Sequence, residues 1–371
     1  MGFDVWRSTG FKSLRITCFN KNEYSYEKVD KIMEYNNKHV LPYLSYAGLI
    51  FLLAALVTVL FLMSVLWGTA EIPIITFLDV LLGNESPTGI ILLELRLPRA
   101  ILALAVGASL GMSGAALQGL LRNPLAEPGL IGVSGCAALG SVIVFYTGLS
   151  VTYSFALPLG GMIGACLSVG LLYCLAGRDP SILTIILAGV AINTVAGALT
   201  ILALNLAPNP FAAFEVFFWL LGSLTDRSMN HLFMALPFIV IGTCFLLSTR
   251  RGLDALTLGE DVAFSLGINI KSLQTKIVLG IALAVGASVS VAGVIGFVGL
   301  IVPHLLRPFV GYSPGYLLIP CGLGGAALTL AADIVVRFAT QGPELQLGVL
   351  TSLIGAPFFL VLVIKMRREG R

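Results

Sequence analysis

The hydrophobic pattern of the chain consists of long apolar runs separated by short polar segments. The runs are about 20 residues long, which is the length that an α-helix needs to cross a bilayer. They lack the ten-residue alternation that is typical of membrane β-barrels. The pattern therefore predicts an all-α membrane protein. Ten transmembrane helices are expected, at 43–67, 97–120, 129–148, 153–176, 182–206, 231–249, 273–292, 294–311, 316–336 and 347–366.

One further apolar stretch, 211–224, is too short for a full crossing. We expect a re-entrant or interfacial helix there, with Trp219 at the membrane interface, where tryptophan is enriched.

The composition agrees with a membrane protein. Hydrophobic residues make up 57% of the chain and charged residues 11%, against about 45–50% and 25% in soluble domains. The net charge of +3 is too small and too dispersed to favour nucleic acid as a partner. The six cysteines form no close pair and the three histidines lie far apart, so no metal site is predicted. A phosphate-binding GxxxxGK[ST] loop is absent from the sequence, and neither a cofactor nor an active site is expected.

The distribution of basic residues predicts the orientation. Residues 1–42 form a polar tail with seven Lys and Arg and no early apolar core, unlike a signal peptide. An even number of spans places both termini on one side, and cytoplasmic termini put eighteen Lys and Arg inside and four outside. The four on the outer face are Arg96, Arg99, Arg227 and Arg337. We therefore expect both termini in the cytoplasm; the role of the tail stays open.

An internal repeat relates the second span to the seventh. The segment AVGASLGMSG (105–114) recurs as AVGASVSVAG (284–293), with six of ten positions identical. Because five spans separate the copies, they run in opposite directions, as in the inverted repeats that build many transporters. Close helix packing alone also favours such small residues.

Acidic residues are scarce inside the predicted spans, which argues against an ion-coupled transporter. Asp333 precedes Arg337 by four positions and can pair with it along one helix. The energy source is therefore expected outside this chain.

The inside loop 250–272 has the pattern of a short surface helix. Glu260 suits a helix N-terminus, and Gly267 suits the left-handed position after the helix end. Leu258, Val262 and Leu266 share one face. Such a short helix needs a surface to pack on, either that of a partner or that of the chain itself.

These residues resemble the FecCD family, the permease subunits of ABC importers for iron–siderophore complexes, haem and vitamin B12. The matching stretches, in chain order, are LRLPRAILALAVGASLGMSGAALQGLLRNPLAEPGLIGVSGCAALG, WLLGSL, LTLGEDVAFSLGINI, GVIGFVGLIVPHLLRPFVG, LAADIVVRFA and ELQLGVLTSLIGAPFFLVLV. The long polar tail departs from the family pattern.

The resemblance implies a BtuC-like permease fold for residues 43–371, with ten transmembrane helices and an inverted repeat. It implies a homodimer, two cytosolic ATP-binding subunits that hydrolyse the ATP, and a periplasmic substrate-binding protein. The expected location is the bacterial inner membrane, and the expected cargo is a siderophore, haem or cobalamin, with an iron complex favoured.

The resemblance also implies roles for individual residues. Exposed arginines that pair with glutamates of the binding protein correspond to Arg96, Arg99 and Arg337, although these could simply reach lipid head groups. The helix that docks on the ATPase corresponds to Leu258, Gly259, Glu260, Ala263, Leu266 and Gly267. The cytoplasmic gate corresponds to Asn123 and Leu125, with the 177–181 loop as its other half. Asn193 and Thr194 are candidate path-lining residues, or else bond between helices.

The alternative function is a self-sufficient secondary transporter or channel for a metal ion, and a structural scaffold is a third possibility. The scarcity of acids in the spans and the exposed loop 250–272 favour the importer.

Overall fold

The structure is a computed structural model that describes residues 45–68, 87–153, 155–177, 181–207, 209–339 and 345–369. Within these ranges every regular element is helical, which confirms the predicted all-α class. The predicted cytoplasmic tail, 1–42, lies outside the described residues. So does most of the 177–181 loop, the second half of the predicted gate.

A helix stands at the position of each predicted span. Eight of these helices are long and apolar enough to cross a membrane. They are α2 (Tyr46–Leu66), the continuous η1 (Ile91–Arg96) and α5 (Leu97–Leu121), α8 (Ala156–Ala176), α9 (Ile182–Asn205), α11 (Met229–Ser248), α14 (Ile270–Ala292), α16 (Pro314–Ala339) and α17 (Leu347–Glu369).

The third and eighth predicted spans are shorter than expected. Instead of 129–148 and 294–311, the structure has α6 (Val133–Tyr146) and α15 (Val298–Leu306), the latter extended by η3 (Arg307–Val310). A turn of 3-10 helix, η2 (Pro128–Ile131), and a left-handed Gly132 precede α6. Non-helical backbone at membrane depth is tolerated where protein covers it, and Ile131 and Ile295 are both buried.

Short helices complete the chain: α4 (Pro87–Ile90), α7 (Leu149–Thr152), α10 (Pro210–Leu220), α12 (Arg250–Leu256) and α13 (Glu260–Ser265). The 11 residues of α10 extend about 16 Å, which is too short for a full crossing, as expected; a re-entrant or interfacial position stays a prediction. Trp219 is 8% exposed and packs against Phe145 of α6, and its position at the membrane interface stays a prediction.

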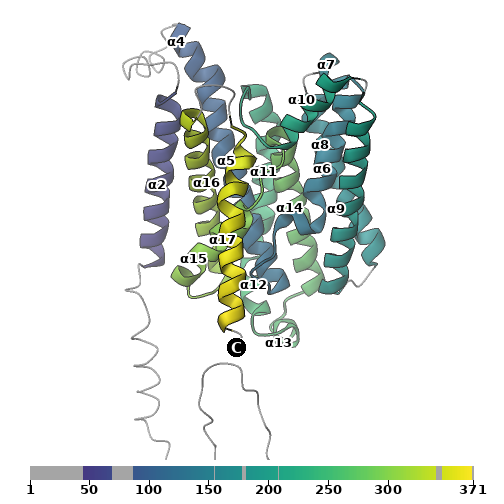
Figure 1. Cartoon of the computed structure of the whole chain (residues 1–371). Helices are drawn as coiled ribbons and strands as arrows, with labels where there is room; N and C mark the ends of the chain where they lie inside the picture. Colours follow the sequence, from purple (N-terminus) through teal and green to yellow (C-terminus); the bar gives the residue numbers. More distant parts are fainter. Residues whose placement is uncertain are drawn as a thin grey trace, which may run out of the picture.

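The long helices run roughly parallel in one bundle (Figure 1). At one end, here called the α13 end, lie α12, α13 and the C-terminal end of α17; α4, α7 and α10 lie at the opposite end, here called the α4 end (Figure 1). The first described residues of α2 are also at the α13 end. An even number of crossings therefore separates the two ends of the described chain.

The inverted repeat is visible at the centre of the bundle. The two most buried spans are α5 and α14, which carry the two copies. Ser109 and Ser288, equivalent residues of the repeat, are hydrogen-bonded to each other at 2.7 Å. Equivalent residues can meet in this way where a pseudo-two-fold axis passes between them, as an inverted repeat requires.

The helices that pack on the two copies of the repeat are also related by the inverted symmetry. The helix α5 packs on α16, with Gly107 against Gly325, while α14 packs on α8, with Gly286 against Ala165. A Cβ atom added to Gly107 would lie 2.3 Å from the carbonyl oxygen of Gly325. At the Gly107–Gly325 crossing the backbones are too close for any side chain, so glycine is required there for packing.

Candidate functional site

Three of the four arginines predicted on the outer face form one cluster at the α4 end. Arg99 at the start of α5 pairs with Asp333 of α16, with Nη2 to Oδ1 and Nε to Oδ1 distances of 2.9 Å. Arg337, one turn after Asp333, pairs with its other oxygen. The predicted pairing of Asp333 with Arg337 is thus confirmed, whereas the second partner, Arg99, was missed because 234 positions separate it from Asp333.

Two of the three arginines, Arg96 and Arg337, bind the C-terminal end of α2. Arg96 donates from Nη1 to the carbonyl oxygen of Leu66 at 2.8 Å, and Arg337 donates from Nη1 to that of Ser64 at 2.7 Å. The last carbonyls of a helix have no partner within the helix, and cations are favourable beside them. The four side chains Arg96, Arg99, Asp333 and Arg337 are called the arginine cluster below.

The cluster is more enclosed than expected. Arg96 is 7% exposed, and the Arg99 and Arg337 side chains are 13% and 8% exposed. The expectation of freely exposed arginines is wrong, because each binds groups of this chain as well as facing the end of the bundle. These contacts limit the rotamers of the three arginine side chains and hold their guanidinium groups in a defined arrangement.

The loop 250–272, here called the coupling loop, forms α12 and α13 at the opposite end of the bundle (Figure 1). Leu258 and Leu266 are 63% and 61% exposed, and Val262 is 44% exposed, so the predicted apolar face is turned outward. Gly267 has φ +81° just after α13, which confirms its predicted left-handed conformation.

One coupling-loop prediction is wrong. Ala263 has no exposed surface and faces into the chain, so it is not available to a partner. Its neighbour Phe264 is 74% exposed and was missed. A six-residue helix completes fewer than two turns, and its inner face is decided by how it packs and not by its hydrophobic pattern. Gly259 precedes α13 with φ +112°, and Glu260 opens the helix.

The predicted gate residues Asn123 and Leu125 lie in the loop between α5 and η2, here called the gate loop (122–127). Asn123 is exposed, and its Oδ1 accepts a hydrogen bond from the Leu125 backbone N–H at 2.9 Å. This bond makes a local turn that sets the position of Leu125.

Glu127 joins the gate loop to the start of α15. Its Oε1 accepts a hydrogen bond from the Phe297 backbone N–H at 2.7 Å, at the start of α15. Burial raises the pKa of the Glu127 carboxyl, and this bond opposes the shift. Phe297 has φ +66°, a strained conformation for an aromatic residue, and its ring lies against Gly355 of α17. The sequence contains no local signal for this contact.

The predicted path-lining residues lie on the exposed side of α9. Thr194 donates from its hydroxyl to the Val190 carbonyl of its own helix at 2.8 Å. Asn193 lies against Gly135 of α6, where an added Cβ would be 2.3 Å from its Oδ1. The structure does not bring either residue to the groove described next.

A wide groove of about 680 Å³ lies between the end of α10, the segment before α15 and the first turns of α17. Small residues of α17, Gly348, Ser352 and Ala356, recur every four positions and form one wall. This face of the last span is a candidate passage wall that sequence reasoning missed, although the spacing of small residues was a usable signal.

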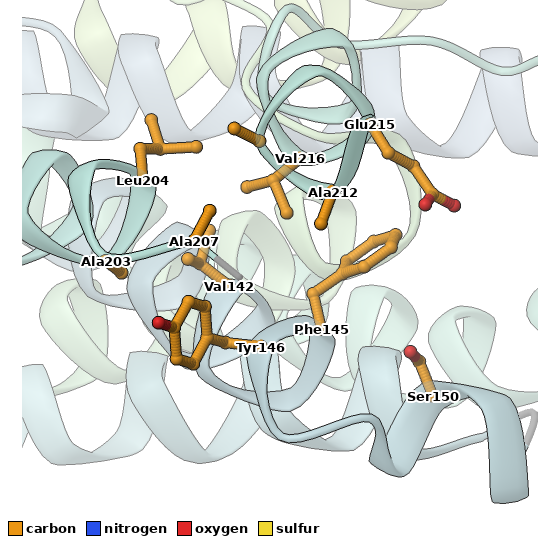
Figure 2. Close-up of a pocket in the computed structure, with 11 residues that line it drawn as sticks. Val142, Phe145, Tyr146, Ser150, Ala203, Leu204, Ala207, Ala212, Glu215 and Val216 are labelled. Atoms are coloured by element: carbon orange, nitrogen blue, oxygen red, sulfur yellow. The ribbon is translucent and has the colours of Figure 1, made fainter. Parts of the chain in front are cut away.

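A second hollow of about 350 Å³ lies beneath α10 (Figure 2). Phe145 of α6 and Val216 of α10 face each other across it (Figure 2). Its lining is mostly apolar, with polar side chains at Tyr146, Ser150 and Glu215. Among the described residues, no three His, Cys, Asp or Glu side chains are grouped so as to hold a metal ion.

Comparisons with known proteins agree with this architecture. The model of the FecCD transport family matches residues 56–365. The hemin transport system permease protein HmuU of Yersinia pestis is 37% identical over 75% of this chain and 84% of its own length. The vitamin B12 import system permease protein BtuC of Klebsiella pneumoniae is 34% identical over 82% of this chain and 95% of its own.

A solved structure supports the same relationship. It describes a metal-chelate type ABC transporter in an inward-facing conformation, with a TM-score of 0.76 and 31% identity. It covers 86% of this chain, and the match extends over all of that chain. By its helical architecture, its inverted repeat and the match over residues 56–365, this multi-pass membrane protein belongs to the FecCD transport family.

Proposed function

We propose that this chain is the permease subunit of a binding-protein-dependent ABC importer in the bacterial inner membrane. Its cargo is an iron complex (a siderophore or haem) or cobalamin, in keeping with the hemin and vitamin B12 permeases that it resembles. Two copies form the pathway, and ATP is hydrolysed by two cytosolic partner subunits. One observation carries this proposal. The exposed apolar face of α13 and the arginine cluster lie at opposite ends of one bundle.

The acids of the described spans support an external energy source. Asp333 is buried, and Arg99 and Arg337 neutralise it. A proton- or sodium-coupled carrier needs an acid within a span that can change its charge or ligand. An acid held between two arginines is poorly suited to that task, which disfavours the secondary transporter.

Sidedness follows from the basic residues. With the α13 end in the cytoplasm, the first described residues of α2 and the C-terminal end of α17 are inside, as the distribution of Lys and Arg along the sequence favours. The coupling loop then meets the ATP-binding subunits, and the arginine cluster meets the substrate-binding protein. Closure of the ATPase dimer would displace α13 and rock the spans about the passage, giving alternating access.

The decisive experiment is reconstitution in proteoliposomes. This chain, purified with its ATP-binding partner, should import radiolabelled haem, cyanocobalamin or a ferric siderophore only when the binding protein is present and ATP reaches the ATP-binding subunits. The chain alone, under a proton or sodium gradient, should import none of these probes and no free metal ion. Gradient-driven uptake by the chain alone would overturn the proposal and favour the secondary transporter.

We propose that the arginine cluster docks acidic side chains of the binding protein. Replacing Arg96 and Arg337 together with glutamate should weaken docking about tenfold at low salt, since charge reversal replaces attraction to the acidic partner with repulsion. The effect should shrink in high salt because of screening. Docking is measured by surface plasmon resonance on nanodiscs, with ATPase association as a second readout.

The control separates charge from structure, because Arg337 also holds Asp333. Asp333→Asn disturbs the pairs that Asp333 forms with Arg99 and Arg337 without adding negative charge. Docking that weakens equally in Asp333→Asn would mean a structural effect, and unchanged affinity in the double variant would refute the proposed docking role.

A further inference from the structure

The coupling loop is fastened to the beginning of α16. Asp254 of α12 accepts two hydrogen bonds through Oδ1, from the Ser313 hydroxyl at 2.6 Å and from the Gly315 backbone N–H at 2.7 Å. The first N–H groups of a helix have no partner within it, and a carboxylate there is favourable. Asp254 therefore caps a helix that begins about 60 positions further along the chain.

A cation–π contact strengthens the attachment. The Arg250 guanidinium carbon lies 4.0 Å from the centroid of the Tyr316 ring and 5.9 Å from that of Tyr46 on α2. The two rings pack edge to face at 5.2 Å. A guanidinium at this distance is attracted by the ring face, so α12 is held to both α16 and α2.

The backbones also approach closely at this point. A Cβ added to Gly315 would lie 2.4 Å from the carbonyl oxygen of Arg250 and 2.4 Å from Oδ2 of Asp254. Only glycine fits at this contact, so α12 has little freedom to shift on α16.

The segment from α12 to α13 is short and internally bonded. Thr257, Leu258 and Gly259 donate their backbone N–H groups to carbonyls of α12. Leu256 and Ala263 are fully buried and anchor the two helices. A displacement of α13 by a partner would therefore be passed to α12.

The other end of α16 carries the arginine cluster. Gly315 and Asp333 belong to the same helix, and at 1.5 Å per residue they lie about 27 Å apart, close to the thickness of the hydrocarbon core. Along this length α16 is held against α5 by the Gly107–Gly325 contact, and Arg96 and Arg99 lie at the start of α5. One helix thus joins both ends of the bundle.

We propose that Asp254, supported by Arg250, is a positioning residue that links the coupling loop to α16, so that binding-protein docking at the arginine cluster and ATP hydrolysis are coupled through this helix. This inference rests on the proposed importer function. Neither residue touches cargo or nucleotide; both act through the position of α12 and α13.

The test compares Asp254→Ala with Asp254→Asn in the full complex reconstituted in nanodiscs. The amide oxygen of asparagine can still accept from Ser313 and Gly315, whereas alanine cannot. We expect basal ATPase activity within about twofold of wild type in both variants. Stimulation by the binding protein should fall at least about fivefold in Asp254→Ala and stay near wild type in Asp254→Asn. Glu215→Ala, at an exposed acid within the helix α10, is the matched control.

Contrary outcomes are distinguishable. Full stimulation in Asp254→Ala, or equal loss of basal and stimulated activity, would overturn the inference. If the Asp254→Ala complex does not assemble, Tyr316→Leu is tested in its place, because it removes the ring that Arg250 contacts. The same loss of stimulation, with basal ATPase activity kept, is then expected. Failure of the wild-type complex to import any probe would instead refute the proposed function.

Discussion

Replacing Gly114 with valine should leave almost no folded permease in the membrane. A Cβ at this position would lie 1.9 Å from the carbonyl oxygen of Gly299 and 2.5 Å from its Cα. These are backbone atoms at the crossing of α5 with α15, so they cannot turn aside as a side chain would. Overpacking typically costs about 1–3 kcal/mol, occasionally more, and a direct backbone clash belongs to the upper end.

The measurement is the yield of monodisperse protein and its melting temperature in detergent. Gly170→Val on α8 is the matched control, since a Cβ there meets nothing within 4 Å. We expect the control to match wild type. A Gly114→Val protein with wild-type yield and melting temperature would contradict the close approach of α5 and α15.

Replacing Leu258 and Phe264 together with aspartate should abolish stable association with the ATP-binding subunits. Both side chains are strongly exposed on the coupling loop, at 63% and 74%. Burial of such a side chain contributes about 1.5–3 kcal/mol, so losing two of them weakens binding by a factor of about 100 or more, at tenfold per 1.4 kcal/mol. Association is measured by co-purification and by titration of the ATPase onto nanodiscs.

The control introduces aspartate in place of an exposed side chain at the other end of the bundle. Tyr153, 51% exposed after α7, can be replaced with aspartate without touching the coupling loop. We expect this variant to retain the ATPase. If the double variant also retains it with wild-type affinity, the α13 face is not the docking surface.

The coupling loop also shows where sequence reasoning reaches its limit. The spacing of Leu258, Val262 and Leu266 alone predicts an apolar face, and these side chains are exposed. The inward position of Ala263 and the outward position of Phe264 depend on how α13 sits on the protein. Composition and spacing do not contain that information.

The arginine cluster makes the same point. The distribution of basic residues predicts that Arg96, Arg99 and Arg337 share one face of the membrane, and they do lie at one end of the bundle. The bonds from Arg99 to Asp333 and from Arg337 to the end of α2 join residues more than 200 positions apart. No local pattern reports such a contact.

The sequence by itself determined the helical class, the approximate position of each span and the repeat, because lipid leaves the backbone no hydrogen-bond partner outside its own helix. Each transmembrane helix is therefore encoded by a continuous apolar segment, which can be recognised in the sequence without the structure. Only the tertiary structure decided the shortened α6 and α15, the bond from Glu127 to Phe297, the α17 wall of the groove and the cap of Asp254 on α16. These features depend on contacts between segments that are distant in the sequence. Where protein and not lipid surrounds the backbone, its polar groups can bond to other segments, so the chain need not be a continuous helix.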